Sequence, residues 1–350
     1  MSAKEKIAVI LFNLGGPDNL DAVKPFLFNL FNDPAIITLP NPLRWLLAKR
    51  ISSGRAPVAR EIYAQIGGKS PLLEQTQAQA RALETQCADR YDLRAFPAMR
   101  YWHPMADQTI TEVAAWGPDR IVLLPLYPQF STTTTGSSLT DWERTARASG
   151  LSVPTHKICC YPWTEKLITA HAHALGMAID QASGPTRVLF SAHGLPEKFV
   201  AGGDPYQWQI EGMAERIVGA LDRPELDWRV CYQSRVGRLK WIGPSTEDEI
   251  ATAGRDGMGL IVLPLAFVSE HSETLVELDI EYRELAQEKG VPAYHRIPAL
   301  GCDEQFIAAL GEAVDLALEK DDICSHTGHR LCPADRSQCP AQINKAAHAS

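Results

Sequence analysis

The sequence predicts an α/β protein with a chelatase-like arrangement of two similar Rossmann-like domains, each with a four-stranded parallel sheet flanked by helices. Its short apolar runs are nearly continuous rather than alternating, which is typical of strands buried on both faces of a parallel sheet. These runs alternate with helical segments in the rhythm of a doubly wound fold. The two halves also share motifs: Ile121-Val-Leu-Leu-Pro-Leu-Tyr is echoed by Leu260-Ile-Val-Leu-Pro-Leu-Ala-Phe.

The predicted elements follow one another without long gaps. Strands are expected at 6–12, 93–99, 120–126, 153–159, 187–192, 228–233, 259–265 and 292–297. Helices are expected at 71–90, 105–115, 138–149, 163–182, 208–221, 245–253, 272–289 and 303–319. The eight strands divide into two sets of four, which predicts an N-terminal domain (1–165), a C-terminal domain (166–320) and an irregular tail (321–350). Because ligands bind at the carboxyl ends of strands in open α/β sheets, a cleft between the domains is the expected site.

Composition excludes several classes of protein. The chain has 350 residues, of which 45% are hydrophobic and 22% charged, and a net charge of −8. This balance is typical of a soluble enzyme, and the acidic charge argues against a nucleic-acid partner. The sequence shows neither a signal peptide nor a run of ~18 apolar residues, so we expect a cytoplasmic protein that can still lie on a membrane surface.

A histidine follows one buried strand at the edge where ligands bind. His193 occurs in Ser191-Ala-His-Gly-Leu-Pro, where Gly194 and Pro196 shape a tight turn. An imidazole held there can take up a proton or bind a metal. The alternative is a structural loop histidine.

A row of carboxylates follows another buried strand. Glu270, Glu273, Glu277 and Glu281 are spaced to line one face of a helix. The simple interpretation is a solvated acidic face. However, the row begins at the ligand end of a strand and places like charges together, which suits proton removal or metal delivery.

Two further strand ends combine cations with aromatic rings. One loop carries Arg235, Arg238, Lys240 and Trp241, and the other is Met99-Arg-Tyr-Trp-His, with Arg100 and Tyr101. Such groups can bind a flat anionic ligand by stacking and by ion pairs to carboxylates. The alternative for each is a surface loop.

An apolar region near the N-terminus is too broken to cross a bilayer. It spans 26–50 and is interrupted by Pro34, Pro40 and Pro42. Part of it is expected in the core, and the rest can form an apolar lip for a hydrophobic ligand, with Lys49 and Arg50 near lipid headgroups. A dinucleotide site is disfavoured, because Leu14-Gly-Gly-Pro is not G-x-G-x-x-G and no Walker A pattern occurs.

Together these segments resemble the ferrochelatase family over nearly the whole chain. The resemblance rests on Ser191-Ala-His-Gly-Leu-Pro, Tyr232-Gln-Ser-Arg-Val-Gly, Trp241-Ile-Gly-Pro-Ser-Thr and Glu270-His-Ser-Glu-Thr-Leu-Val-Glu-Leu-Asp-Ile-Glu-Tyr. It implies a lyase that inserts Fe²⁺, as substrate, into protoporphyrin IX to form protohaem. It also implies that His193 and Glu273 are the catalytic pair and the metal ligands, and that Glu277 and Glu281 extend a polar path. Arg100, Tyr101 and Trp241 match positions that line the porphyrin pocket, and Arg235 adds a cation to it.

The tail carries three cysteines, Cys324, Cys332 and Cys339. Some ferrochelatases resemble this arrangement and hold a [2Fe–2S] cluster with three C-terminal cysteines and one internal cysteine, for which Cys159 and Cys160 are the candidates. Four cysteine ligands are what such a cluster needs. The alternative is a reduced tail without a cluster.

Three rival functions stay open at this point. One is a chelatase for coproporphyrin or for another tetrapyrrole and metal, such as cobalt and a sirohydrochlorin-type ring. The second is a haem carrier without catalytic activity, and the distant third is a dinucleotide-dependent enzyme. The sequence does not indicate the iron donor, the oligomeric state or the division of roles between His193 and Glu273.

Overall fold

The computed structural model describes residues 4–237 and 239–341 and divides into two compact units. The first unit contains the residues up to Tyr161 together with Leu310–Leu331, and the second contains Pro162–Ala309 and Cys332–Cys339. Each unit is built on a parallel sheet, with five strands in the first and four in the second. The predicted α/β fold class is therefore confirmed.

The sheet of the first unit has the order β2-β1-β3-β4-β9. Its strands are β1 (Lys6–Asn13), β2 (Asp92–Met99), β3 (Arg120–Pro125), β4 (Thr155–Cys160) and β9 (Cys324–Ser325). The prediction of four strands is wrong here by one, because the tail adds β9, in which Cys324 pairs with Ile158 of β4. A two-residue strand has no hydrophobic pattern that the sequence could reveal.

Helices of the first unit flank this sheet. They are α3 (Leu72–Cys87), α4 (Ala106–Trp116) and α5 (Ser137–Ser149). The core on the α4–α5 side includes Phe12 and Trp142, whose rings meet edge to face at 5.9 Å.

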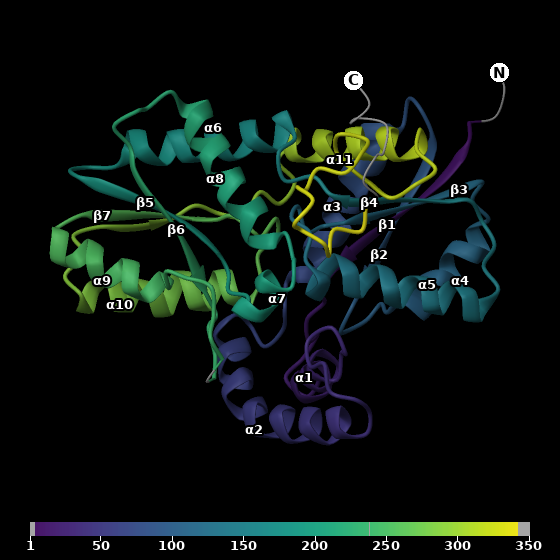
Figure 1. Cartoon of the computed structure of the whole chain (residues 1–350), viewed down its shortest axis with the longest axis horizontal. Coiled ribbons are helices and arrows are strands. Elements are labelled where there is room, and N and C mark those ends of the chain that lie inside the picture. Colours follow the sequence, from purple (N-terminus) through teal and green to yellow (C-terminus); the bar gives the residue numbers. More distant parts are fainter. Residues whose placement is uncertain (1–3, 238, 342–350) are drawn as a thin grey trace. The chain divides into compact units, whose positions relative to one another are not determined.

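The apolar region forms two helices, α1 (Val23–Phe31) and α2 (Leu43–Gln65), which pack on each other. Figure 1 shows this pair extending away from the sheet of its own unit. Phe28 and Trp45 join the two helices through an edge-to-face contact at 6.2 Å. Among the described residues, no helix is both long and apolar enough to cross a membrane.

The sheet of the second unit has the order β6-β5-β7-β8. Its strands are β5 (Thr186–His193), β6 (Asp227–Gln233), β7 (Gly259–Pro264) and β8 (Tyr294–Arg296). Figure 1 shows α6 (Glu165–Gln181) and α8 (Tyr206–Leu221) on one face, and α9 (Thr246–Asp256) and α10 (Tyr282–Glu288) on the other. The short α7 (Glu197–Ala201) follows β5, and α11 (Glu304–Leu318) precedes the tail.

Two predicted helices begin as π-helices. They are η1 (Thr132–Gly136), which follows β3 and leads into α5, and η2 (Glu273–Glu281), which follows β7 and leads into α10. Each of them follows one copy of the motif that the two halves share, which begins at Ile121 in one copy and at Leu260 in the other. π-helical turns are rare and concentrate at functional sites, so η2 directs attention to the carboxylates that it carries.

Candidate active site

His193 is the last residue of β5, at the carboxyl edge of the second sheet. Its Nδ1 lies 2.6 Å from the carbonyl oxygen of Gly194, and the Tyr206 hydroxyl donates to the carbonyl of His193 at 3.0 Å. Because a carbonyl only accepts, Nδ1 must carry a hydrogen. Nε2 is therefore the atom that faces the site and that can hold a proton or a metal.

Glu273, the first residue of η2, meets this nitrogen. Its Oε1 lies 3.5 Å from His193 Nε2, and its Oε2 lies 3.3 Å from His271 Nε2. Burial alone would lower the pKa of His193, but the charge of Glu273 and the bonds to Glu273 and Gly194 outweigh it and raise that pKa to about 9. Burial opposes the charge of Glu273 as well, yet the two histidines hold its pKa well below its usual value. The resting pair is thus an imidazolium and a carboxylate.

Glu277 follows Glu273 along η2, and residues at the end of β6 donate hydrogen bonds to its carboxylate. Gln233 Nε2 donates to its Oε2 at 3.1 Å, and Ser234 donates through its backbone N–H at 2.8 Å and through its hydroxyl at 2.5 Å. Burial and the charge of Glu273 nevertheless raise the pKa of Glu277, against the effect of the Ser234 bonds. Gln233 also reaches the backbone carbonyl of Glu273 at 3.4 Å and so ties β6 to the start of η2.

The predicted carboxylate row is wrong at its start. Glu270 precedes η2, and its carboxylate pairs with Arg296 at 2.5 Å. It therefore belongs to a structural ion-pair group that also includes Asp279. Glu281 is the last residue of η2 and is exposed. Only Glu273 and Glu277 of the four share the network next to His193.

Sequence reasoning missed several members of this network. His271 is 7% exposed and contacts Glu273, while Gln233, Ser234 and Tyr282 contact Glu277. His271 could have been noticed from its position two residues before Glu273. Gln233 and Ser234 come from the end of β6, whose approach to η2 depends on the strand order of the sheet, whereas Tyr282 directly follows η2 in the same continuous helix.

Arg235 and Trp241 lie against the turn that follows His193. A Cβ added at Gly194 would come within 2.9 Å of the Gln233 carbonyl oxygen, 3.1 Å of Arg235 Cγ and 3.2 Å of Trp241 Cε3. Only a glycine allows this close approach. Both side chains are half-buried, whereas Arg238 lies outside the described residues.

Arg100 and Tyr101 belong to the first unit, where they surround the buried Asp33. Arg100 Nη2 lies 2.9 Å from an oxygen of Asp33, and the Tyr101 hydroxyl donates to the same oxygen at 2.7 Å. Arg100 also donates to Ser137 at 2.7 Å. Tyr101 is only 1% exposed, so its side chain supports Asp33 and Arg100 rather than forming an open surface.

Comparisons with known proteins identify the family. The family model described as Ferrochelatase matches residues 6–318. The chain belongs to the ferrochelatase family. A protein named Ferrochelatase from Caulobacter vibrioides (strain NA1000 / CB15N) is 53% identical over 350 residues, covering 98% of this chain and 99% of that protein. One from Phenylobacterium zucineum (strain HLK1) is 54% identical over 340 residues, covering 95% and 97%.

A solved structure of the same architecture agrees with the fold of the family. SirB from Bacillus subtilis with Fe³⁺ superimposes with a TM-score of 0.53 at 13% identity, covering 89% of this chain and 95% of that one. At this identity the similarity supports the fold and nothing finer.

Family membership agrees with the small number of metal donors at the site. Among the described residues, no group of three or more His, Cys, Asp or Glu side chains is arranged to hold a metal ion. His193 and Glu273 are thus a pair rather than a closed cage. A closed set of three or four protein ligands would suit a resident metal, whereas family members must release their iron.

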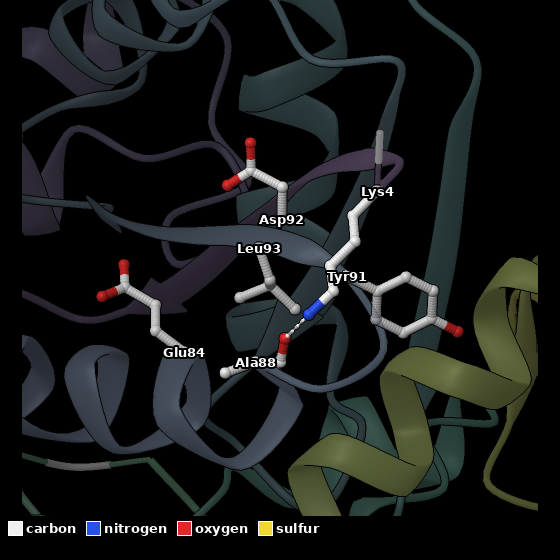
Figure 2. Close-up of a pocket in the computed structure, with 6 residues that line it drawn as sticks. All are labelled: Lys4, Glu84, Ala88, Tyr91, Asp92 and Leu93. Atoms are coloured by element: carbon white, nitrogen blue, oxygen red, sulfur yellow. Dashed lines mark hydrogen bonds between the residues drawn. The ribbon is translucent and has the colours of Figure 1, made fainter. Parts of the chain in front are cut away.

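Two surface pockets of the first unit are separate from the His193 pair. One has a volume of about 450 Å³ and includes Asp33, Arg100 and Asp141 in its lining. Figure 2 shows the other, of about 360 Å³, in which Lys4 donates to the carbonyl of Ala88 at 2.5 Å. Arg100 lines the larger of these two pockets, whereas none of the predicted site residues lines the pocket in Figure 2.

The cysteines named from the sequence are all buried. Cys159 and Cys160 end β4 with their sulfurs 3.6 Å apart, and Cys324 lies in the neighbouring β9. Burial, and next the charge of Cys159, raise the pKa of Cys324 to about 11. In the tail, Cys332 and Cys339 are 5% and 7% exposed, and Cys332 accepts a bond from Gln209 at 3.2 Å.

Proposed function

We propose that this lyase inserts Fe²⁺ into protoporphyrin IX and that His193 and Glu273 carry out the insertion. The observation that carries the proposal is the contact of His193 Nε2 with Glu273 at the carboxyl edge of the second sheet. An imidazole and a carboxylate are both suitable ligands for Fe²⁺. A general base at such a site typically contributes a factor of about 10²–10⁴.

Proton balance decides the order of steps. A free-base porphyrin loses two pyrrole protons as Fe²⁺ enters. His193 begins protonated because of Glu273, so it cannot accept a pyrrole proton at once. Binding of Fe²⁺ displaces the Nε2 proton to solvent. When the iron moves into the ring, the neutral imidazole is left free to accept the first pyrrole proton. Both residues therefore meet the iron before His193 acts as the base.

The test is anaerobic metal insertion, measured as the loss of free-base fluorescence with Fe²⁺ or Zn²⁺. We expect His193→Ala to lower the rate by at least about 10²-fold. The matched control is His295→Ala, which removes an exposed histidine of the same unit. Insertion by wild type that His193→Ala leaves unchanged would contradict the assigned role. No insertion by wild type, with tight porphyrin binding, would contradict the function.

The porphyrin is held by cations and an aromatic ring. Trp241 and Arg235 lie beside the turn after His193 and can stack on the macrocycle and pair with a propionate. In the first unit, Arg100 is held by Asp33 and Ser137, and Tyr101 supports Asp33, so this cation is available to pair with a propionate. Competition between protoporphyrin and coproporphyrin tests the substrate: a preference for the more polar ring would contradict our assignment.

The α1–α2 segment contacts the cytoplasmic membrane surface. Four large apolar side chains are exposed between positions 39 and 46: Leu39 (41%), Leu43 (56%), Trp45 (40%) and Leu46 (55%). Lys49 lies over the Trp45 ring at 4.8 Å, which places a cation beside this apolar surface. Exposed apolar groups next to cations are typical of interfacial helices.

Co-sedimentation with anionic phospholipid vesicles tests this contact. We expect Leu43→Ser combined with Leu46→Ser to weaken binding by about tenfold or more, since each buried leucine contributes ~1.5–3 kcal/mol. Met177→Ser, at a 51% exposed position on α6, is the matched control. Equal binding by all three proteins would refute the contact.

The tail cysteines hold a [2Fe–2S] cluster. Cys324, Cys332 and Cys339 are buried although their segment contains almost no regular structure, which suits a segment ordered by a metal group. Cys159 or Cys160 would supply the fourth thiolate ligand. Because these cysteines are not gathered into a metal-holding group in the described residues, binding of the cluster requires the tail to rearrange.

Visible absorbance and electron paramagnetic resonance of anaerobically purified protein test the cluster. Cys339→Ser should abolish both signals, whereas Cys302→Ser, at an exposed cysteine outside the proposed set, should leave them intact. A colourless wild-type protein that contains no iron or acid-labile sulfide would refute the proposal.

A further inference from the structure

The hydrogen-bond network around Glu277 continues through a tyrosine that the sequence did not single out. The hydroxyl oxygen of Tyr282 lies 3.0 Å from Glu277 Oε1 and also 3.0 Å from Glu247 Oε1. Tyr282 is the first residue of α10 and is 4% exposed, while Glu247 lies in the first turn of α9. A buried phenol therefore connects carboxyl groups from two different elements.

One hydroxyl hydrogen cannot satisfy both contacts. A tyrosine donates a single O–H bond at a time, and an ionised carboxylate only accepts. If Glu277 and Glu247 were both ionised, the single Tyr282 hydroxyl hydrogen could bond to only one of them. The other carboxylate oxygen would then lie 3.0 Å from the tyrosine oxygen with no hydrogen between the two atoms. A proton on one carboxyl group removes this conflict, because that group then donates to the tyrosine oxygen. The raised pKa of Glu277 supports the presence of this extra proton.

We propose that Glu277, Tyr282 and Glu247 form a proton relay that carries pyrrole protons away from the insertion site, a role that rests on the proposed function. In one step, the proton on Glu277 Oε1 forms a bond to the Tyr282 oxygen while the original Tyr282 proton passes to Glu247 Oε1. One O–H bond forms for each that breaks, and no electrons are transferred. Rotation of the Tyr282 hydroxyl then resets the relay.

The surroundings distinguish the two ends of the relay. Glu277 is bonded to Ser234 and Tyr282, and the charges of Glu273 and His193 act on its carboxyl group. Glu247 is less buried than Tyr282, but its second oxygen is itself buried and has no hydrogen-bond partner among the described residues. Glu247 lies at the N-terminus of α9, where negative charge is favoured, so it is suited to be the ionised carboxylate that accepts from Tyr282 at rest. The path thus turns from η2 to α9 instead of following η2 to Glu281.

The test compares Tyr282→Phe with Tyr294→Phe. The Tyr294 hydroxyl also bonds to η2, but to the backbone carbonyl of Leu278 at 2.7 Å and not to a carboxyl group. Zn²⁺ insertion into protoporphyrin is measured at saturating substrates in weak buffer, with and without imidazole as a mobile proton carrier. We expect Tyr282→Phe to lower kcat by about tenfold, below the ~10²–10⁴ of a direct acid–base group. Its KM should stay unchanged and imidazole should restore its kcat, whereas imidazole should not affect Tyr294→Phe.

A loss in Tyr282→Phe that imidazole does not restore, or no loss at all, would overturn the relay. Infrared spectroscopy of the protein without substrates gives a readout that does not need activity. Wild type should show the C=O band of a protonated carboxyl group at neutral pH, which Glu277→Gln should remove or diminish and Tyr282→Phe should shift. Absence of that band in wild type would refute the shared proton. If wild type shows the band but inserts no metal, the proposed function fails and the relay role fails with it, while the shared proton stands.

Discussion

Replacing Glu273 by glutamine should lower the pKa of His193 and so increase the neutral fraction of its imidazole at physiological pH. Glu273 Oε1 lies 3.5 Å from His193 Nε2 and supplies the main effect that raises the histidine pKa. Burial lowers the pKa of His193, and in the variant the charge of Glu273 no longer opposes this effect. We therefore expect the pKa of His193 to be lower in the variant than in wild type.

The magnitude follows from the geometry of the pair. A rise from 6.5 to about 9 would correspond to about 3 kcal/mol, at about 1.4 kcal/mol per pKa unit. The His193 side chain is 42% exposed, so solvent screens part of this interaction. We accordingly expect Glu273→Gln to lower the pKa of His193 by ~1–2 units, which is ~1–3 kcal/mol.

Nuclear magnetic resonance titration of the histidine ring signals measures this pKa directly. The His193 signal is assigned by its absence in His193→Gln, and Glu281→Gln on the exposed end of the same π-helix serves as the control. In wild type, Zn²⁺ affinity should rise with pH up to about 9, because metal must displace the Nε2 proton, and it should level off earlier in Glu273→Gln. Equal His193 pKa values in wild type and Glu273→Gln would refute the electrostatic reasoning.

The same pair makes stability depend on pH with a defined sign. The raised pKa of His193 contributes stability that is fully present below 6.5 and is lost as pH rises through about 9. The lowered pKa of Glu273 contributes stability that is present above its ordinary value of 4.5 and is lost as the pH falls through its folded value. The advantage of wild type over Glu273→Gln should therefore be largest between 4.5 and 6.5 and disappear above about 9.

Three further substitutions test other parts of the structure. Arg296→Met should destabilise the protein by ~1–3 kcal/mol in urea unfolding, because Glu270 loses its ion pair with Arg296 and Asp279 keeps the longer 3.6 Å contact with Arg283; no measurable loss would contradict this. Asp33→Asn removes the charge that holds Arg100 at 2.9 Å and should raise the porphyrin KM several-fold with little change in kcat; an unchanged KM would place Arg100 outside the binding site. Gly194→Ala should lower insertion by more than ~10-fold, because the added methyl group would lie 2.9 Å from the Gln233 carbonyl and displace the turn beside His193; full activity would show that the turn can adapt.

Much of the fold was predictable because its strands are buried on both faces. β1, β5 and β7 read as continuous apolar runs, and their observed bounds differ from the expected ones by one or two residues. His193 was found for the same reason, since it directly follows such a run. The helices α1 and α2 were not assigned, because three prolines interrupt the 26–50 region and hide its helical periodicity.

The network around Glu277 was beyond prediction for a topological reason. Ser234 follows β6, Tyr282 follows η2 and Glu247 begins α9, so their meeting depends on the order β6-β5-β7-β8 and on how α9 and α10 cover that sheet. Regular spacing within one segment suggested instead that the path would run to Glu281. The carboxylates separate because η2 starts only at Glu273, which leaves Glu270 free to turn toward Arg296.

A pair of donors, rather than a closed cage, is what an enzyme needs when iron is its substrate. A full set of protein ligands would hold the ion too strongly to release it, whereas His193 and Glu273 leave most coordination positions to water and then to the porphyrin nitrogens. The attraction between His193 and Glu273 also favours a proton on His193 in place of the metal. When the iron leaves, a proton can return to His193 and restore the ion pair, so the release of the product is coupled to the uptake of a pyrrole proton. This coupling explains why a histidine whose pKa is raised to about 9 can still serve as the base: the iron, and not the bulk pH, removes its proton.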